Sequence, residues 1–411
     1  MRTISLERPA AGVSFGDDRY WEGLTAATAH LDPPLGVISL EALASNAFDM
    51  LRRANGMPIR VASKSVRVRS VLDSVLALPG FAGVLSYTLA ESLWLAETID
   101  DVVLAYPTVD RGALRRLMES ELLAARVTLM VDSVAHLDLI DAVLPPDRRP
   151  VLQVAIELDT SFTAPVLGRM GVWRSPIHDA AGAVELARAI SGRRGFALVG
   201  MMAYESQIAG LPDDPPGQRA RAGIVRRMQK ASFAELLERR GEVVSAVRTV
   251  ADLRFVNGGG TGSLELTSAD PSVTELGAGS GLLGGHTFDN FTRFSPAPAA
   301  AFALPVVRKA EPGSATLLGG GWVASGPPAA DRLPRIEWPR GLHFARYEMA
   351  GEVQTPVLGE AAADLALGDR VWLRHAKSGE LSEHIDEFHI VDGGAVVDVV
   401  PTYRGEGTAF L

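Results

Sequence analysis

Lysine is scarce in this sequence, and one of its lysines follows a short apolar segment. The chain carries 40 lysines and arginines, and only four of them are lysines: Lys64, Lys230, Lys309 and Lys377. Lys64 comes directly after the strand-like run Arg60–Ser63. An amine held among apolar neighbours has a lowered pKa, so it can attack a carbonyl and form a Schiff base. The alternative is a lysine whose amine simply reaches from a strand end to water.

Two glycine-rich segments could hold an anion. The run Phe255–Ser263 contains four glycines within five residues, and the run Gly277–Gly281 follows the next apolar segment. Glycines let backbone N–H groups crowd an anion without Cβ clashes, and hydroxyl groups add donors. The candidate phosphate-binding residues are Gly259, Gly260, Thr261, Gly262, Gly279 and Ser280. The alternative is a pair of flexible turns.

The pattern Gly-x-Gly-x-x-Gly occurs at Gly279, Gly281 and Gly284. A dinucleotide site needs a helix after this pattern and an acidic residue about 20 positions further on. The segment Gly285–Asn290 is not helical in its pattern, and no suitable acid follows it. The pattern therefore does not indicate a dinucleotide fold.

Two other side chains follow strand-like runs and could contact a bound group. Arg169 can hold an anion or a phenolate-type oxygen, or it can cap a helix at the surface. Tyr204 can stack on a planar cofactor, or it can be an ordinary loop aromatic. A Schiff-base lysine, a phosphate cradle and an arginine near them together describe a site for pyridoxal 5′-phosphate.

The segment Leu373–Glu380 places His375 and Lys377 two residues apart. If this segment is extended, both side chains point to the same face. His375, His384 and His389 are spaced too irregularly to define a metal site, and solvated histidines are the alternative.

The elements that must position these residues alternate between apolar strand-like runs and amphipathic helical stretches such as Arg111–Leu123 and Val134–Leu144, a pattern typical of a parallel α/β fold. Eight strands are expected: Ile59–Ala62, Gly83–Ser86, Val102–Ala105, Val127–Val131, Val151–Leu158, Ala197–Ala203, Leu253–Asn257 and Val273–Leu276. This count favours a (β/α)8 TIM-type barrel, whose chemistry lies at the carboxyl ends of the strands. An open doubly wound sheet is the alternative.

We expect three regions: an N-terminal extension over 1–32, the barrel over 33–290 and a β-rich domain over 291–411. The extra strand Gly36–Leu40, before the helical stretch Glu41–Ala54, is assigned to the β domain. The β runs expected there are Phe302–Arg308, Ala315–Leu318, Arg346–Val353, Arg370–Arg374, Phe388–Val391 and Ala395–Val400, with a hairpin turn at Asp392–Gly394. Tyr204–Gln218 is expected to be a loop at a strand's carboxyl end.

Composition and net charge exclude further classes of fold and partner. The chain has no cysteine and a net charge of −9, which excludes disulfide frameworks and argues against a nucleic-acid partner. Neither a signal peptide nor an apolar run of about 20 residues is visible, so we expect a cytoplasmic protein with no membrane partner.

Five segments, in this order and spacing, resemble the fold-type III pyridoxal phosphate enzymes. They are Pro34–Leu40, Arg60–Ser65, Gly168–Gly171, Asn257–Gly262 and Glu275–Ser280. The resemblance is to the D-threonine aldolase and D-serine dehydratase branch, which joins an alanine-racemase-like barrel to a small β domain. It covers roughly residues 35–402.

This resemblance implies roles for residues at matching positions. Lys64 corresponds to the Schiff-base lysine, Arg169 to the rim arginine, Tyr204 to the cofactor-facing aromatic and the two glycine segments to the phosphate loops. The family also binds a divalent metal through a His-x-Cys or His-x-Asp pair, whereas this chain has His375-x-Lys377. Because an ammonium has no lone pair and repels a cation, no metal ligand is assigned.

The resemblance leads to an expected activity on a small amino acid substrate. We expect cleavage of D-3-hydroxy amino acids by a retro-aldol reaction, with Lys64 as covalent anchor, Lys377 as a fixed charge in place of the metal, and His375 as the base because it titrates near neutrality. The alternatives are β-elimination, racemisation and a non-catalytic carrier of the cofactor. The resemblance also implies a homodimer.

Overall fold

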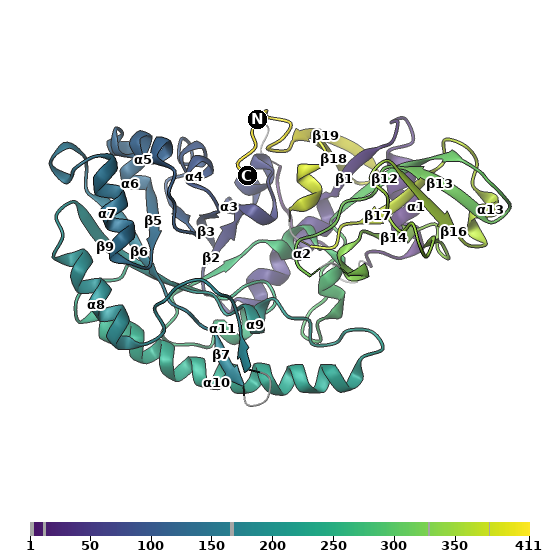
Figure 1. The fold of residues 1–411 in the computed structure, drawn as a ribbon. Coiled ribbons are helices and arrows are strands. Elements are labelled where there is room, and N and C mark those ends of the chain that lie inside the picture. Colours follow the sequence, from purple (N-terminus) through teal and green to yellow (C-terminus); the bar gives the residue numbers. More distant parts are fainter. Residues whose placement is uncertain (1–3, 11–13, 165–167, 328, 378) are drawn as a thin grey trace.

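The computed structural model describes residues 4–10, 14–164, 168–327, 329–377 and 379–411, and its first part is a closed barrel of eight parallel strands (Figure 1). In barrel order the strands are β10 (Phe255–Gly258), β11 (Glu275–Ala278), β2 (Ile59–Ala62), β3 (Phe81–Ser86), β4 (Val102–Leu104), β5 (Val127–Val131), β6 (Leu152–Glu157) and β9 (Phe196–Ala203). The eight expected strands are thus confirmed, and the open sheet is excluded.

Helices follow the barrel strands in chain order. They are α3 (Arg69–Leu76), α4 (Leu89–Leu95), α5 (Arg111–Met118), α6 (Glu121–Arg126), α7 (Val134–Val143), α8 (Ala180–Ser191), α9 (Ser206–Ala209), α10 (Arg219–Arg248), α11 (Leu264–Thr267) and α12 (Ser280–Leu283). The expectation of one helix over Arg111–Leu123 is wrong, because Ser120 accepts a hydrogen bond from Leu123 N and starts α6 as a separate helix. The expected loop Tyr204–Gln218 likewise contains α9.

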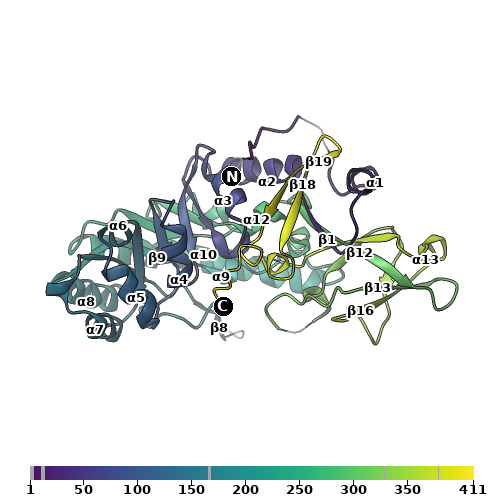
Figure 2. The same ribbon diagram turned by 90° about the horizontal axis from the view of Figure 1, so that it is seen from above.

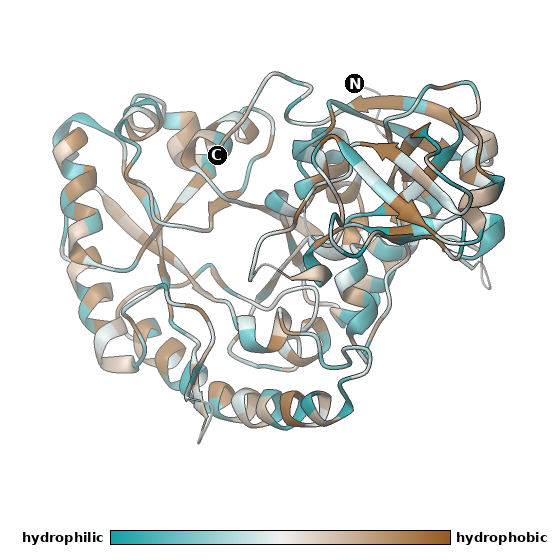
Figure 3. Cartoon of the chain, turned by 45° about the vertical axis from the view of Figure 1, so that its right-hand side comes forward, coloured by the Kyte–Doolittle hydropathy of each residue, from teal (hydrophilic) through white to brown (hydrophobic). Residues whose placement is uncertain are grey.

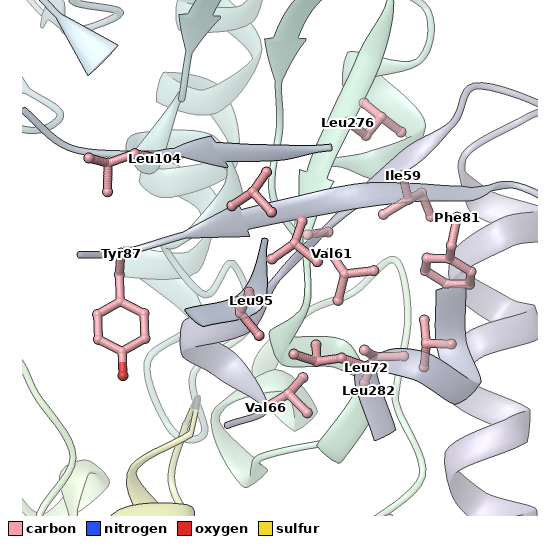
Figure 4. Close-up of a cluster of buried hydrophobic side chains, with 14 of the residues drawn as sticks. Ile59, Val61, Val66, Leu72, Phe81, Tyr87, Leu95, Leu104, Leu276 and Leu282 are labelled. Atoms are coloured by element: carbon pink, nitrogen blue, oxygen red, sulfur yellow. The ribbon is translucent and has the colours of Figure 1, made fainter. Parts of the chain in front are cut away.

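The barrel core follows from the alternation of side chains along its strands. Val103, Met202 and Phe255 point into the barrel, where the ring of Phe255 lies against Gly200, a position at which a Cβ would come within 2.3 Å of that ring. Their neighbours along the strands pack outward against the helices. Figure 4 shows this outer layer, in which Ile59 and Val61 of β2 lie among side chains that include Leu72 of α3.

The second part of the chain is a nine-stranded sheet beside the barrel (Figures 1 and 2). Its strands are β1 (Leu35–Ser39), β12 (Ala300–Arg308), β13 (Ser314–Leu318), β14 (Arg335–Trp338), β15 (His343–Phe344), β16 (Gln354–Leu358), β17 (Arg370–Arg374), β18 (Glu387–Asp392) and β19 (Ala395–Pro401), with the short helix α13 (Ala361–Asp364) beside them. β1 lies between β12 and β18, so the first strand of the chain does join the β domain. The turn between β18 and β19 confirms the expected hairpin.

One expected strand of this domain is absent. Residues Arg346–Val353 form turns and irregular chain, because Met349 adopts a positive φ of 53° and its N–H donates to Ala345 O. The strand lies one segment later, as β16. The sequence pattern does not indicate β14, β15 or the small hairpin of β7 (Phe162–Ala164) and β8 (Gly168–Met170) that follows β6.

The helix α1 (Asp18–Ala27) of the N-terminal region packs on the β domain. Trp21 and Trp372 are both fully buried, with ring centroids 6.2 Å apart. Helix α2 (Leu40–Arg53), capped by Ser39, then leads into the barrel. Figure 3 shows hydrophobic and hydrophilic residues alternating along the long outer helix α10. Among the described residues no helix is long and apolar enough to cross a membrane.

Candidate active site

The carboxyl ends of several barrel strands open into a cavity of about 680 Å³ that also contacts the β domain. Eight of the residues singled out from the sequence line it: Lys64, Tyr204, Gly259, Gly260, Thr261, Gly279, Ser280 and Lys377. Three others, Arg169, Gly262 and His375, are not among its lining residues. Gly262 packs beneath the wall, where a Cβ would come within 2.2 Å of Ala209 O.

Lys64 lies in the 3₁₀ turn Ser63–Ser65 that directly follows β2. Its Nζ donates a hydrogen bond of 2.9 Å to the hydroxyl oxygen of Tyr106, which follows β4 on the same rim. Burial alone raises the pKa of a phenol, but the Lys64 ammonium and the Arg174 guanidinium together lower the pKa of Tyr106 below its ordinary value. The pair therefore places an amine and an unusually acidic phenol side by side.

The two glycine segments meet at one end of the cavity. The hydroxyl oxygens of Thr261 and Ser280 are 3.1 Å apart, and Gly281 N donates to Thr261 Oγ1. Gly260 and Gly279 have no room for side chains, since their Cβ atoms would come within 2.9 Å of Ala209 Cβ and 2.4 Å of Ala62 O. The result is a close-packed cradle of hydroxyl and backbone donors, which is chemistry suited to a phosphate group.

A buried carboxylate accepts hydrogen bonds from the glycine loop after β10. Glu205 directly follows Tyr204 and is fully buried, and its Oε2 accepts a hydrogen bond of 3.1 Å from Gly259 N. Its Oε1 accepts from Ser263 Oγ at 3.2 Å and from Thr267 Oγ1. Arg240 of α10 lies 3.5 Å away. Glu205 thus fixes the backbone of the glycine loop after β10.

Arg174 is the arginine that the structure brings into the cavity. Its guanidinium lies 5.2 Å from the ring centroid of Tyr106 and 5.4 Å from that of Tyr204. Burial raises the pKa of Tyr204 to about 12, so this phenol stays protonated near neutral pH. Arg174 also lies 3.6 Å from Glu157, whose pKa burial raises to about 7.

Arg169, which the sequence analysis placed toward the cofactor, lies instead on the outer hairpin β7–β8. It pairs with Asp159 Oδ2 at 2.9 Å, and its guanidinium stacks 4.1 Å from the ring centroid of Trp173. Arg174, five residues further on, therefore occupies the rim position in this structure.

His375 and Lys377 do not share a face. β17 ends at Arg374, so the extended geometry on which the expectation depended stops before both residues. His375 is 4% exposed, and neither ring nitrogen has a hydrogen-bond partner within the described chain. Burial, together with Arg374, lowers the pKa of His375 to about 3. The expectation that His375 titrates near neutrality is therefore wrong.

Lys377 does line the cavity, and burial with the nearby Arg332 guanidinium lowers its pKa. Arg332, Thr287 and Tyr106 are lining residues that the sequence analysis missed. Tyr106 follows β4 directly, so the strand-end argument used for Lys64 was sufficient to find it. Arg332 and Thr287 lie in short 3₁₀ segments and carry no such signal. Within the described ranges, no cluster of three or more His, Cys, Asp or Glu residues could hold a metal.

We expect the substitution Glu205→Gln to lower the free energy of unfolding by about 3 kcal/mol. The change removes the charge that faces Arg240 and leaves this buried guanidinium with Asp270, 3.3 Å away, as its remaining carboxylate. Urea denaturation followed by circular dichroism measures the effect.

The control is Glu235→Gln, which removes a carboxylate from a more exposed pair with Arg239 on α10. This change is expected to cost less than about 1 kcal/mol. Equal destabilisation by the two substitutions would show that the buried carboxylate has no special role.

Comparison with known proteins gives likenesses in structure only. No family model and no curated protein match the sequence. The crystal structure of D-threonine aldolase from Filomicrobium marinum superposes with a TM-score of 0.76 at 21% identity, covering 92% of this chain and 96% of that one. For D-threo-3-hydroxyaspartate dehydratase from Delftia sp. HT23 the TM-score is 0.65 at 19% identity, with coverage of 90% and 97%.

Alanine racemase from Corynebacterium glutamicum is also similar, with a TM-score of 0.54 at 18% identity over 82% of this chain and 88% of that one. All three likenesses extend over the barrel and the β domain together. The chain therefore has the alanine-racemase-like fold of the fold-type III enzymes that its sequence motifs resemble.

Proposed function

We propose that this protein is a pyridoxal phosphate-dependent lyase that cleaves D-3-hydroxy amino acids into an aldehyde and glycine. The observation that carries the proposal is the position of Lys64, whose amine lines the same cavity as the glycine cradle. The likeness to a D-threonine aldolase and to a D-threo-3-hydroxyaspartate dehydratase, both named for D-3-hydroxy amino acids, supports this substrate class.

The cavity residues fit this cofactor. Lys64 supplies a primary amine as covalent anchor, and Thr261 and Ser280 supply hydroxyl donors for a phosphate. Tyr204 and Arg174 add an aromatic and a guanidinium face near the same space. The bound cofactor would supply the electron sink that makes cleavage of the bond between Cα and Cβ feasible.

Tyr106 takes the role that the sequence analysis gave to His375. Cleavage of that bond requires a base that accepts the proton of the substrate's β-hydroxyl group. His375 lies outside the cavity lining, whereas Tyr106 lines the cavity beside Lys64 and faces the Arg174 guanidinium, which lowers the pKa of its phenol. We therefore assign proton acceptance to the Tyr106 phenolate oxygen.

Lys377 provides a fixed positive charge on the β-domain side of the cavity. In sequence it stands at the second position of the pair that binds a metal in the resembled family. An ammonium can orient an oxygen of the substrate, although less strongly than a divalent ion does. The same ammonium can also protonate a leaving hydroxyl, which makes β-elimination to a keto acid and ammonia the second candidate reaction.

The homodimer implied by the resemblance stays a prediction, which sedimentation of the purified protein would check.

The substitution Lys64→Ala is expected to abolish both the visible absorbance of the protein purified with pyridoxal phosphate and the release of aldehyde from D-threonine. Lys230→Ala, on the outer helix α10, is the matched control and should change neither. Aldehyde and ammonia released from D- and L-hydroxy amino acids are measured separately, because aldehyde indicates cleavage and ammonia indicates elimination. A visible band that persists in the Lys64→Ala protein would reject the anchor.

Tyr106→Phe is expected to lower the turnover rate about 100-fold and to change its pH dependence. Because the phenolate accepts the proton, activity should rise with pH through the pKa of Tyr106, which the Arg174 guanidinium lowers from its ordinary value. The Tyr106→Phe protein should lack this rise, while Tyr204→Phe should retain it, since the pKa of Tyr204 is about 12. A pH profile unchanged by Tyr106→Phe would contradict the assignment.

Treatment with a chelator such as EDTA is expected to leave the activity within about twofold of its starting value, because Lys377 already supplies the positive charge at this position. Activity measured before chelation, after chelation and after addition of manganese or zinc checks this expectation. Loss on chelation followed by recovery with a metal would show that a divalent ion is required.

A further inference from the structure

The β-domain wall of the cavity presents three hydrogen-bond donors that the protein leaves unused. Thr287, Arg332 and Lys377 all line the cavity. Thr287 Oγ1 and Arg332 Nε are buried and have no hydrogen-bond partner in the described chain. In the same residues, no carboxylate lies within ion-pair distance of Lys377 Nζ. Unused buried donors are costly, and their gathering at one wall indicates a ligand that accepts hydrogen bonds.

The backbone holds these residues close to one another. Thr287 N donates a hydrogen bond of 3.0 Å to Ala376 O, which places Thr287 beside the residue that precedes Lys377. A Cβ on Gly285 would come within 2.9 Å of Lys377 Cα, so the two segments are in close contact. Leu333, the neighbour of Arg332, has its carbonyl oxygen 2.9 Å from Nε2 of His286, the neighbour of Thr287. The Arg332 guanidinium also lowers the pKa of Lys377. The three donors therefore belong to one cluster.

The charge of this wall is not balanced. Glu380 carries the only side-chain carboxylate among the described lining residues, and its Oε1 accepts hydrogen bonds from Ser325 N at 3.2 Å and from Ser325 Oγ at 3.1 Å. Arg332 has Asp331 as its ion-pair partner, at 3.9 Å and on a side chain that is 60% exposed, where water weakens the attraction. On this wall the two cations Arg332 and Lys377 therefore face one half-buried side-chain carboxylate that already accepts two hydrogen bonds.

The chemistry of the cluster matches a carboxylate. A carboxylate carries one negative charge and two oxygens, and it accepts charge-assisted hydrogen bonds from guanidinium and ammonium groups. The glycine cradle, which lies on other segments of the cavity lining, already supplies hydrogen-bond donors for a phosphate. The α-carboxylate of an amino acid is bonded to the same carbon as its amine. It must therefore lie within a few ångströms of the group with which that amine reacts.

We propose that Thr287, Arg332 and Lys377 form the subsite that binds the α-carboxylate of the substrate, an inference that rests on the proposed function. Lys377 lies close enough to Lys64 for the second amine to lower its pKa further. Binding at this subsite and at the position of Lys64 would fix two of the four substituents of Cα. The handedness of the substrate then decides which remaining substituent faces the base.

The test compares two ligands that differ by one carboxylate. The protein purified with pyridoxal phosphate is titrated with D-serine and with 2-aminoethanol, which is serine without its carboxylate, and the change in visible absorbance gives each affinity. Arg332→Leu is expected to weaken binding of D-serine about 10- to 100-fold and to leave binding of 2-aminoethanol unchanged, since a hydrogen bond to a charged group contributes about 1.5–3 kcal/mol. Thr287→Val should weaken D-serine binding several-fold.

Two further variants separate charge from structure. Arg332→Lys should restore part of the affinity for D-serine, because it keeps the charge. Arg404→Leu removes an exposed arginine that pairs with Asp386 and should change neither affinity.

Equal weakening of both ligands by Arg332→Leu, or unchanged binding of D-serine, would overturn the subsite. A wild-type protein that shows no visible band and binds neither ligand would instead reject the proposed function itself.

Discussion

The buried ion cluster of Glu205, Arg240 and Asp270 is the interaction on which the geometry of the cavity depends. All three side chains are almost completely inaccessible to solvent, and the arginine lies within 3.5 Å of Glu205 and 3.3 Å of Asp270. Charges buried in this way contribute little net stability, because each one loses its hydration. Their benefit here is conformational specificity. Glu205 follows β9, accepts the Gly259 N–H that follows β10, and meets Arg240 of α10, so one carboxylate sets the relative positions of three elements.

A second constraint joins the cavity to the β domain. From β1 in the nine-stranded sheet, the chain passes through the whole barrel and then returns to pair β12 and β18 with β1. Near the cavity, His286 N donates to His375 O and Thr287 N donates to Ala376 O, both at 3.0 Å. These two bonds connect the segment after the last barrel strand to the segment that carries Lys377. The β-domain wall is therefore held in register with the barrel rim by backbone hydrogen bonds.

Sequence reasoning predicted the barrel and much of the cavity because both depend on local patterns. In a barrel of parallel strands all carboxyl ends meet at one rim, so residues that directly follow strands, such as Lys64, Tyr204 and Gly259, converge without any knowledge of tertiary contacts. The same reasoning fails where the chain leaves regular structure. The prediction for His375 assumed the side-chain period of two of an extended strand, but β17 ends at Arg374. The prediction for Arg169 did not include the hairpin β7–β8, which carries this residue away from the cavity lining. Arg332 lies at the end of the short 3₁₀ turn Ala330–Arg332, and no periodicity marks such a residue.

The scarcity of lysine becomes interpretable once each lysine is located. An arginine stays charged under all ordinary conditions, whereas a lysine amine can lose its proton and has three donors around one atom. Lys309 uses that second property, since its Nζ donates to the carbonyl oxygens of Ala362, Ala363 and Leu365 at the end of α13. Lys64 needs the first property, because only a neutral amine is a nucleophile. At Lys377 a compact ammonium occupies a confined wall beside Arg332, where a second planar guanidinium would need more space. Lys64 therefore requires chemistry that arginine does not provide, whereas Lys230 lies exposed on α10 and has no such requirement.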